Sequence, residues 1–269
     1  MPCVIAIRRE DKNPFERRTP LIPTHVAQLQ QEAGIEVCLQ PAPRRVFTDS
    51  EYLASGASIR EAIDDCSVIL GVKEIPPAAV AAGQTYVLFS HTIKGQPANM
   101  PLLKRLLELG CTLIDYELIV DDAGRRLVFF GRHAGLAGMI DTLWALGRRL
   151  DHEGVETALP QVEPCHNYAS LAAAKAAIKR VGEQLQLPSG LGPLVVGFTG
   201  YGNVSGGAQE ILDLMRPVEL TPADLLAGRL PAGGLVKVVF HEQHMVEPTR
   251  GAGFGLQHYY DHPEAYRPV

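Results

Sequence analysis

Short apolar runs alternate with longer mixed segments along the first half of the chain. The runs are four to eight residues long and rich in β-branched residues, and they cover residues 4–7, 35–39, 68–72, 86–89 and 111–118. Such runs predict strands that are buried on both faces of a parallel sheet. The segments between them predict helices over residues 23–32, 52–64 and 101–109. Strands that alternate with helices indicate βα units and an α/β fold with a mostly parallel sheet.

Turn and capping residues predict where these elements end. Pro23 suits the first turn of a helix, and Gly34 suits the position just after its end. Asp49 or Ser50 is expected to cap the helical segment that follows. Residues 121–124, Asp-Asp-Ala-Gly, predict a turn, and residues 126–130 then complete a hairpin. That hairpin would add an antiparallel edge to the sheet.

The second half opens with two helical patterns, over residues 131–150 and 168–185. Gly135 and Gly138 are small enough to let the first of these helices pack closely against another element. Three further apolar runs predict strands over residues 194–198, 218–220 and 235–240. Because a dinucleotide-binding domain normally has about five or six parallel strands, we expect the second domain to be incomplete.

Two titratable side chains follow neighbouring predicted strands. Lys73 comes directly after the run over residues 68–72, and His91 comes just after the run over residues 86–89. In an open α/β sheet, ligands bind beyond the carboxyl ends of the strands. A half-buried lysine and a histidine there form a candidate proton-transfer pair for amine or imine chemistry. The alternative is that both are polar residues that enter loops.

A glycine turn, residues 200–207 with the sequence GYGNVSGG, joins the predicted strand 194–198 to a helix. A strand, a tight turn and a helix N-terminus are what a dinucleotide fingerprint requires, because the free N–H groups of the helix bind the pyrophosphate. Ser205 stands where the pattern has its third glycine. Glu219 lies 19 residues after Gly200 and could bind the ribose hydroxyls. The alternative is a βα turn without a ligand.

Composition and charge exclude several classes of protein. The net charge is −5 and the isoelectric point is about 6.0, whereas a nucleic-acid binder shows a basic surface. No apolar run approaches the ~18 residues of a membrane span. The five cysteines are far apart and form no C-x-x-C motif, which indicates reduced thiols and neither a disulfide framework nor a zinc site. We therefore expect a cytoplasmic protein that holds no metal.

A set of motifs, in order along nearly the whole chain, resembles one enzyme family. The chain is similar to the lysine–2-oxoglutarate reductase part of bifunctional lysine-degradation enzymes. That part is related to the lysine-forming saccharopine dehydrogenases and, more distantly, to alanine dehydrogenase and the transhydrogenase N-terminal domain. The matching segments are IRRED (7–11), ERRTPLIP (16–23), ILGVKEIPP (69–77), FSHTIKGQPANM (89–100), LIDYE (113–117), AGLAGM (134–139), HNY (166–168), FTGYGNVSGGAQ (198–209) and HPEAY (262–266).

The resemblance implies two Rossmann-like domains, the second of them incomplete at its C-terminal end. Residues 1–133 would form the substrate and catalytic domain, residues 134–152 a connecting helix, and residues 153–269 the NAD(P)-binding domain. The family's catalytic residues fall on Lys73 and His91. Its substrate-binding positions fall on Arg18, with Arg17 beside it, and on Glu117. Its cofactor turn falls on Gly200, Gly202, Asn203 and Val204. Arg8, Arg9 and Arg126 are interpreted as solvated surface charges.

The implied reaction is the NAD(P)H-dependent condensation of L-lysine with 2-oxoglutarate to saccharopine, or its reverse. NADP(H) is the expected cofactor because the family's reductases mostly use NADPH. NAD(H) is the alternative, since Glu219 would repel a 2′-phosphate. The expected partners are the small substrates and a chain that completes the cofactor domain, with no nucleic acid and no membrane. Two other functions stay open: another amino-acid or opine dehydrogenase on the same scaffold, or a truncated, non-catalytic binding module.

Overall fold

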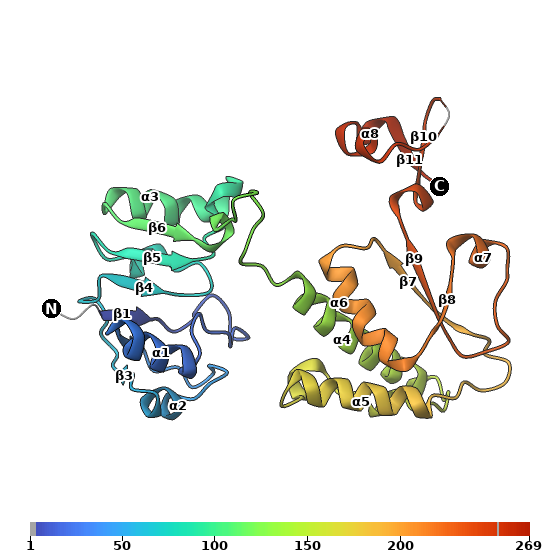
Figure 1. The fold of residues 1–269 in the computed structure, drawn as a ribbon, viewed down its shortest axis with the longest axis horizontal. Helices are drawn as coiled ribbons and strands as arrows, with labels where there is room; N and C mark the ends of the chain where they lie inside the picture. Colours follow the sequence, from blue (N-terminus) through green and yellow to red (C-terminus); the bar gives the residue numbers. More distant parts are fainter. Residues whose placement is uncertain (1–3, 252) are drawn as a thin grey trace. The chain divides into compact units, whose positions relative to one another are not determined.

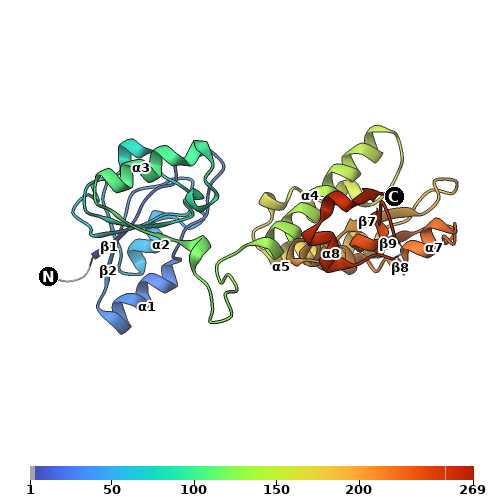
Figure 2. The same cartoon turned by 90° about the horizontal axis from the view of Figure 1, so that it is seen from above.

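A computed structural model describes residues 4–251 and 253–269. It divides the chain into two compact units, Met1–Phe129 and Phe130–Val269, which Figures 1 and 2 show in two views. The sequence placed its domain boundary a few residues later, at residue 133. The long helix α4 (Gly131–His152), expected as a connector, belongs to the second unit and contributes buried residues to its core.

The first unit is built on a six-stranded sheet with the order β3-β2-β1-β4-β5-β6. Every pairing within this sheet is parallel. The strands are β1 (Val4–Ile7), β2 (Glu36–Leu39), β3 (Ser58–Ile59), β4 (Val68–Leu70), β5 (Thr85–Leu88) and β6 (Thr112–Asp115). The predicted α/β class with a parallel sheet is therefore confirmed.

Alternation along the strands divides the apolar residues between the two faces of the sheet. On β2, Val37 and Leu39 belong to one core cluster and Cys38 to the other. Helices α1 (Pro23–Ala33) and α2 (Asp49–Ala54) cover the first face through Val26 and Tyr52. Helix α3 (Met100–Glu108) covers the opposite face, as Figure 2 shows. Such burial on both faces explains why the strands appear as continuous apolar runs.

Three local predictions in the first unit were wrong: the cap of α2, the extent of that helix, which was expected over residues 52–64, and the hairpin. Thr48, not Asp49 or Ser50, caps α2: its hydroxyl accepts the Glu51 N–H, and Glu51 reaches back to the Thr48 N–H. The helix ends at Ala54 because Gly56 turns the chain with a φ of 91°, and β3 follows. Where an antiparallel hairpin was expected, the described residues form one isolated antiparallel bridge, between Val120 and Arg126.

The second unit packs α4, α5 (Leu171–Gln184) and α6 (Asn203–Leu212) with a three-stranded parallel sheet. Its strands, β7 (Leu194–Thr199), β8 (Val218–Leu220) and β9 (Leu235–Phe240), have the order β7-β9-β8. The remaining elements are α7 (Pro222–Leu226), β10 (Val246–Pro248), α8 (Leu256–Asp261) and β11 (Tyr266–Pro268), with β10 and β11 paired antiparallel. Among the described residues, no helix combines the length and apolarity needed to cross a membrane.

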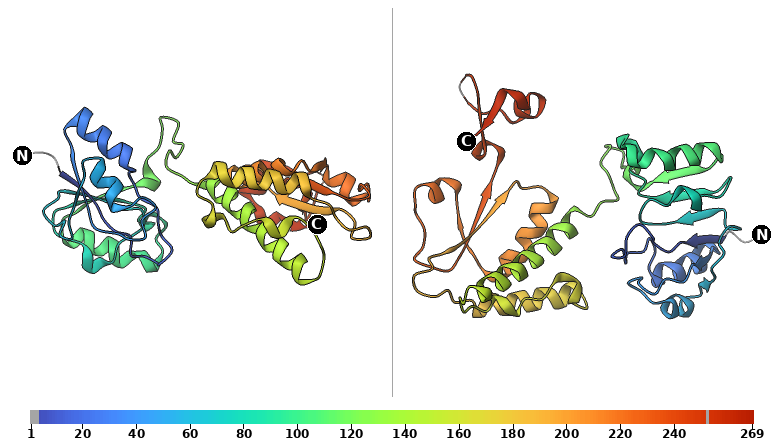
Figure 3. Two further views of the ribbon diagram at one scale, coloured as in Figure 1. Left: turned by 90° about the horizontal axis from the view of Figure 1, so that it is seen from below. Right: turned by 180° about the vertical axis from the view of Figure 1, so that it is seen from behind.

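Helices α4 and α6 lie side by side, as Figures 1 and 3 show, and two glycines make their contact possible. A Cβ on Gly135 would lie 1.9 Å from the carbonyl oxygen of Val204, and a Cβ on Gly207 would lie 2.1 Å from that of Arg132. The packing role predicted for Gly135 is confirmed. Gly138 has no such neighbour within 4 Å of its Cβ position.

Replacing Gly135 with alanine should force the two helices apart. We expect Gly135→Ala to lower the free energy of unfolding by about 1–3 kcal/mol, the usual cost of overpacking. The matched control is Gly138→Ala, three residues further along the same helix, which should be neutral or stabilising by up to about 1 kcal/mol. Urea denaturation of both variants measures the difference, and equal destabilisation would contradict this account of the helix contact.

Candidate active site

The first unit has a topological switch point beside β1. From β1 the chain moves outward to β2 and β3, then returns to β4 on the other side of β1 and continues to β5 and β6. In open α/β sheets, ligands bind at the carboxyl ends of the strands near such a point. Because all six strands are parallel, the segments after β1, β4, β5 and β6 leave the sheet at the same edge. Lys73, His91 and Glu117 all lie in these segments.

Glu10, in the segment after β1, holds the segment after β4. Its carboxylate accepts the N–H of Val72 at 2.7 Å and the N–H of Lys73 at 3.0 Å. Burial raises the pKa of Glu10, and these two hydrogen bonds and the charge of Arg8 offset part of that shift. Lys73 itself is half-buried. Glu10 thus fixes the backbone from which the Lys73 ammonium extends.

His91, after β5, contacts the carboxylate of Glu117, after β6. The distance from His91 Nδ1 to Glu117 Oε2 is 3.1 Å, and the imidazole stacks on Phe89 with ring centroids 6.4 Å apart. His91 has a φ of 54°, in the left-handed region that only glycine, asparagine, aspartate and histidine enter with any frequency. This backbone turn helps to set where the ring points.

Three basic side chains surround Glu117, whose side chain is only 6% exposed. Besides His91, they are Lys94, with Nζ at 3.5 Å, and Arg126, with Nη1 at 3.3 Å. Burial acts to raise the pKa of Glu117, but the His91 hydrogen bond and the nearby positive charges outweigh it and lower the pKa. Glu117 therefore stays ionised and favours a proton on Nδ1 of His91, which leaves Nε2 for proton exchange.

Asp115, the last residue of β6, joins the segments that carry His91 and Glu117. Its buried carboxylate accepts the N–H of Glu117 at 2.8 Å and the N–H of Ser90 at 3.2 Å, and it also accepts the Ser90 hydroxyl. Asn99 donates to the carbonyl of Ser90 at 3.1 Å. These contacts end β6 as a strand, which is why the predicted hairpin does not continue it.

The two arginines predicted to bind substrate carboxylates lie in the segment after β1. Arg18 makes a two-pronged contact with Glu16, with Nε at 2.8 Å and Nη2 at 2.7 Å from its carboxylate oxygens. The charge of Lys73 is among the causes that lower the pKa of Glu16, after the dominant Arg18 hydrogen bond. Arg17 is exposed, and its Nε donates to the carbonyl of Arg44 at 3.3 Å.

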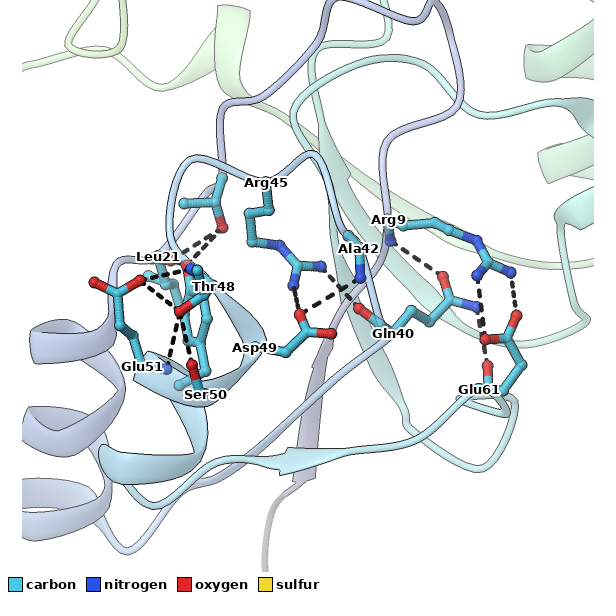
Figure 4. Close-up of polar contacts among 12 residues, drawn as sticks. Arg9, Leu21, Gln40, Ala42, Arg45, Thr48, Asp49, Ser50, Glu51 and Glu61 are labelled. Carbon is cyan, nitrogen blue, oxygen red and sulfur yellow. Dashed lines mark hydrogen bonds and ion pairs between the residues drawn. The ribbon is translucent and has the colours of Figure 1, made fainter. Parts of the chain in front are cut away.

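A pocket of about 300 Å³ lies beside Arg18 and is rich in arginine. Its lining comes from the ends of β1 and β2: Arg8, Arg9, Glu10, Glu16, Arg18, Ala42, Pro43, Arg44 and Arg45. Figure 4 shows part of this region, where Arg45 pairs with Asp49 at 3.0 Å and Arg9 pairs with Glu61. An arginine-lined pocket of this size suits a small carboxylate-bearing ligand.

Arg8 was wrongly interpreted as a solvated charge, whereas Arg9 and Arg126 are exposed, as the sequence predicted. Arg8 is 8% exposed, because its side chain lies against Gly71 and pairs with Asp11 at 2.7 Å. Arg126 contacts the buried Glu117, and its guanidinium lies 5.5 Å from the centroid of the Phe89 ring. Arg9 is half-exposed and pairs with Glu61.

The predicted cofactor turn in the second unit has the geometry of a phosphate loop. Gly200 has a φ of 104°, which favours glycine, and its N–H donates to the carbonyl of Phe240 on β9 at 2.8 Å. Gly202 is the N-cap of α6 and makes no side-chain cap, so the first N–H groups of the helix, at Asn203 and Val204, are available to a ligand. Nothing lies within 4 Å of the Cβ position of Gly202. These residues fit a dinucleotide pyrophosphate.

Glu219 lies within β8 and faces its register partner on β9, Lys237. Its Oε1 is 2.6 Å from Lys237 Nζ, which is also 2.6 Å from Asp213 Oδ1. The Lys237 side chain is 6% exposed and that of Glu219 is 70% exposed. The structure thus gives Glu219 a cross-strand ion pair, and its predicted contact with a ribose stays a prediction.

Three residues that shape the site were not predicted from the sequence. Glu10 could have been identified as an acid just beyond a strand that borders the switch point. Lys94 and Asp115 gave no such indication, because their roles depend on contacts with Glu117 and Ser90 across neighbouring segments.

Comparisons with known proteins identify a family and several relatives. Residues 6–137 match the family described as alanine dehydrogenase/PNT, N-terminal domain. The chain is 41% identical over 290 residues to an alpha-aminoadipic semialdehyde synthase of Arabidopsis thaliana, covering 99% of this chain and 27% of that protein. It is 33% identical over 217 residues to a saccharopine dehydrogenase [NAD(+), L-lysine-forming] of Neurospora crassa, covering 78% of this chain and 56% of that protein.

A solved L-alanine dehydrogenase shares the fold, with a TM-score of 0.55 at 20% identity over 87% of this chain and 60% of that one. The chain spans less than a third of the length of the Arabidopsis relative.

The buried Glu117 should make stability depend on pH. Its folded pKa lies below the ordinary 4.5, so its contribution is present above pH 4.5 and is lost as the pH falls through the folded value. We expect Glu117→Gln to lower the free energy of unfolding at pH 7 by about 2 kcal/mol, because Lys94, Arg126 and the His91 ring lose their carboxylate partner. Thermal unfolding at several pH values should show this difference shrinking at acid pH.

The matched control is Glu108→Gln on α3, where an exposed carboxylate lies 3.8 Å from Lys104. That change should alter stability by no more than about 0.5 kcal/mol at any pH. A wild-type advantage over Glu117→Gln that grows toward low pH would contradict the assignment.

Proposed function

We propose that this chain carries out a nicotinamide-dependent reductive condensation. Residues 6–137 belong to the alanine dehydrogenase/PNT N-terminal domain family. The reaction joins L-lysine and 2-oxoglutarate, with NAD(P)H as the reductant, to give saccharopine, or runs in reverse. One observation carries the proposal: Lys73 and His91 leave the same edge of the sheet from the paired strands β4 and β5. The half-buried Glu10 and the buried Asp115 hold these two segments by accepting backbone N–H groups from them.

The chemistry needs several proton transfers, which these two residues can supply. The amine of lysine attacks the keto carbon of 2-oxoglutarate, and the resulting carbinolamine loses water to form an imine. A hydride then reduces the C=N bond. Each proton step needs a group whose pKa lies near the working pH. We assign His91, with Nδ1 held by Glu117 and Nε2 turned to the substrate, and Lys73, positioned through Glu10, to these transfers.

The arginine-lined pocket supports recognition of the substrate carboxylates. Arg18 lines it, and a substrate carboxylate would take the place of Glu16 in its two-pronged contact with the guanidinium. Arg17 lies beside it in sequence and contributes positive charge. Glu117 supports the orientation of His91, and the positive charges of Lys94 and Arg126 beside it support the attraction of an anionic substrate.

The glycine turn of the second unit is the proposed cofactor site, with Gly200, Gly202, Asn203 and Val204 against the pyrophosphate. When bound, the nicotinamide supplies the hydride. We propose NADP(H) over NAD(H), since the pairing of Glu219 with Lys237 leaves less negative charge to repel a 2′-phosphate. The three strands of this sheet, against about five or six in a dinucleotide domain, support a further segment or chain that completes it. We place the reaction in the cytoplasm.

Replacing the lysine tests the proposal directly. We expect Lys73→Met to lower kcat/KM for lysine plus 2-oxoglutarate at least about 100-fold, the usual range for a general acid–base group, while the unfolding midpoint stays within a few degrees. Oxidation of NADPH or NADH, followed at 340 nm, measures turnover.

Two comparisons make the result specific. Lys104→Met, on the exposed side of α3, should leave turnover unchanged. Pyruvate with ammonia replaces lysine with 2-oxoglutarate in a parallel assay. Faster NAD(P)H oxidation with pyruvate and ammonia would indicate another amino-acid dehydrogenase. No oxidation by a folded protein with either substrate pair would favour a non-catalytic binding module.

A further inference from the structure

Two thiols that the proposed reaction does not use meet in the core of the first unit. The Sγ atoms of Cys38, on β2, and Cys66, just before β4, are 3.3 Å apart. The two residues are 1% and 2% exposed. No disulfide joins them in the structure. The sequence indicated only scattered, reduced cysteines, because 27 residues separate these two along the chain.

The sheet explains why the thiols meet. Strands β2 and β4 flank β1, and Cys38 is in register with Ala6 of β1, which is in register with Ile69 of β4. Residues in register on neighbouring strands point to the same face. The small side chain of Ala6 therefore leaves room above β1, and both thiols pack there in one cluster with Ile63.

A single arginine touches both sulfur atoms. Arg60, which follows β3, has its Nη2 3.0 Å from the Sγ of Cys66 and 3.6 Å from the Sγ of Cys38. Nη1 contacts both carboxylate oxygens of Asp65 at 2.7 Å. The Arg60 side chain is 36% exposed, so it is a polar cover between the thiols and solvent. A guanidinium in this position favours a thiolate, the form of cysteine that reacts with oxidants.

We propose that Cys38 and Cys66 form a redox-modification site, which hydrogen peroxide converts to a reversible intrachain disulfide. The sulfur atoms need to approach by a little more than about 1 Å to reach the ~2.05 Å of a disulfide bond. The inference rests on the short distance between the two sulfur atoms and on the contact of Arg60 with both of them. It does not depend on the proposed enzymatic function.

The reaction balances with peroxide as the oxidant. The Cys38 thiolate attacks one peroxide oxygen, the O–O bond breaks, and the released hydroxide takes a proton to become water. The Cys66 sulfur then attacks the Cys38 sulfenic acid, and its thiol proton leaves with the displaced hydroxide as a second water. Two thiols are oxidised by two electrons, and one peroxide is reduced. Burial and the neighbouring Cys38 raise the pKa of Cys66 to about 12, and Arg60 opposes that rise, so Cys66 enters the second step as the thiol.

The dithiol lies close to the wall of the arginine-lined pocket. Gln40, two residues after Cys38, accepts the N–H of Arg9 at 3.2 Å and donates to the carbonyl of Glu61 at 3.0 Å. Glu61 follows Arg60 and pairs with Arg9, and Figure 4 shows these contacts. The disulfide would therefore form next to the two segments, around Gln40 and around Glu61, that contact Arg9.

The experiment treats the folded wild-type chain with hydrogen peroxide, blocks free thiols under denaturing conditions and maps the peptides by mass spectrometry. We expect a peptide cross-link between Cys38 and Cys66 that dithiothreitol reverses, with Cys111 and Cys165 still alkylated. The oxidised protein should unfold about 5 °C or more above the reduced one, because the disulfide closes a loop of 27 residues.

Arg60→Met tests the role of the arginine and should slow the cross-link about tenfold. Arg125→Met is its matched control, because Arg125 pairs with Asp121 in an exposed turn and should leave the rate unchanged. Oxidation of Cys111 or Cys165 with Cys38 and Cys66 still reduced would overturn the proposal. So would sulfinic acid at Cys38 without a cross-link, or an equal rate in Arg60→Met.

Discussion

The position of β1 in the middle of its sheet is the constraint on which the first unit depends. Because strands are added outward from β1 on both sides, the sequence segments after β1 and β4 leave the sheet side by side. Glu10 uses this proximity when it accepts two backbone N–H groups from the β4 segment. Asp115 does the same for the segments after β5 and β6. Buried carboxylates bound to backbone amides thus set the loops that carry the titratable side chains.

Charge is balanced locally at this edge of the sheet. Burying Glu117 without partners would cost several kcal/mol, and His91, Lys94 and Arg126 offset that cost. Glu16 and Arg18 form a similar pair beside the pocket. Removing a basic member leaves a carboxylate with fewer partners in a poorly solvated place. The cluster therefore stabilises the fold, keeps Glu117 ionised and holds Nδ1 of His91 against its carboxylate.

The sequence predicted the features that depend on neighbouring residues. It did not predict the features that depend on contacts between residues far apart along the chain. Short β-branched runs predicted the strands, and the glycine turn predicted the start of α6. Thr48 was missed as a cap because Asp49 and Ser50 are equally good capping types. Arg8 was taken for a surface charge, since nothing local shows that it lies against Gly71. The meeting of Cys38 with Cys66 requires the order β2-β1-β4, which no short pattern contains.

In the second unit, one glycine-rich segment both shapes the turn before α6 and lets α6 pack closely against α4. Gly200 and Gly202 shape the turn and leave the first amides of α6 open. The third glycine of a dinucleotide motif normally allows close packing of the helix, and here Ser205 stands in its place. Gly207, on the buried side of α6, meets the backbone of α4 at Arg132 and takes over that packing role. The substitution at position 205 therefore leaves both the loop and the helix contact intact, because the close approach has moved two residues along the helix.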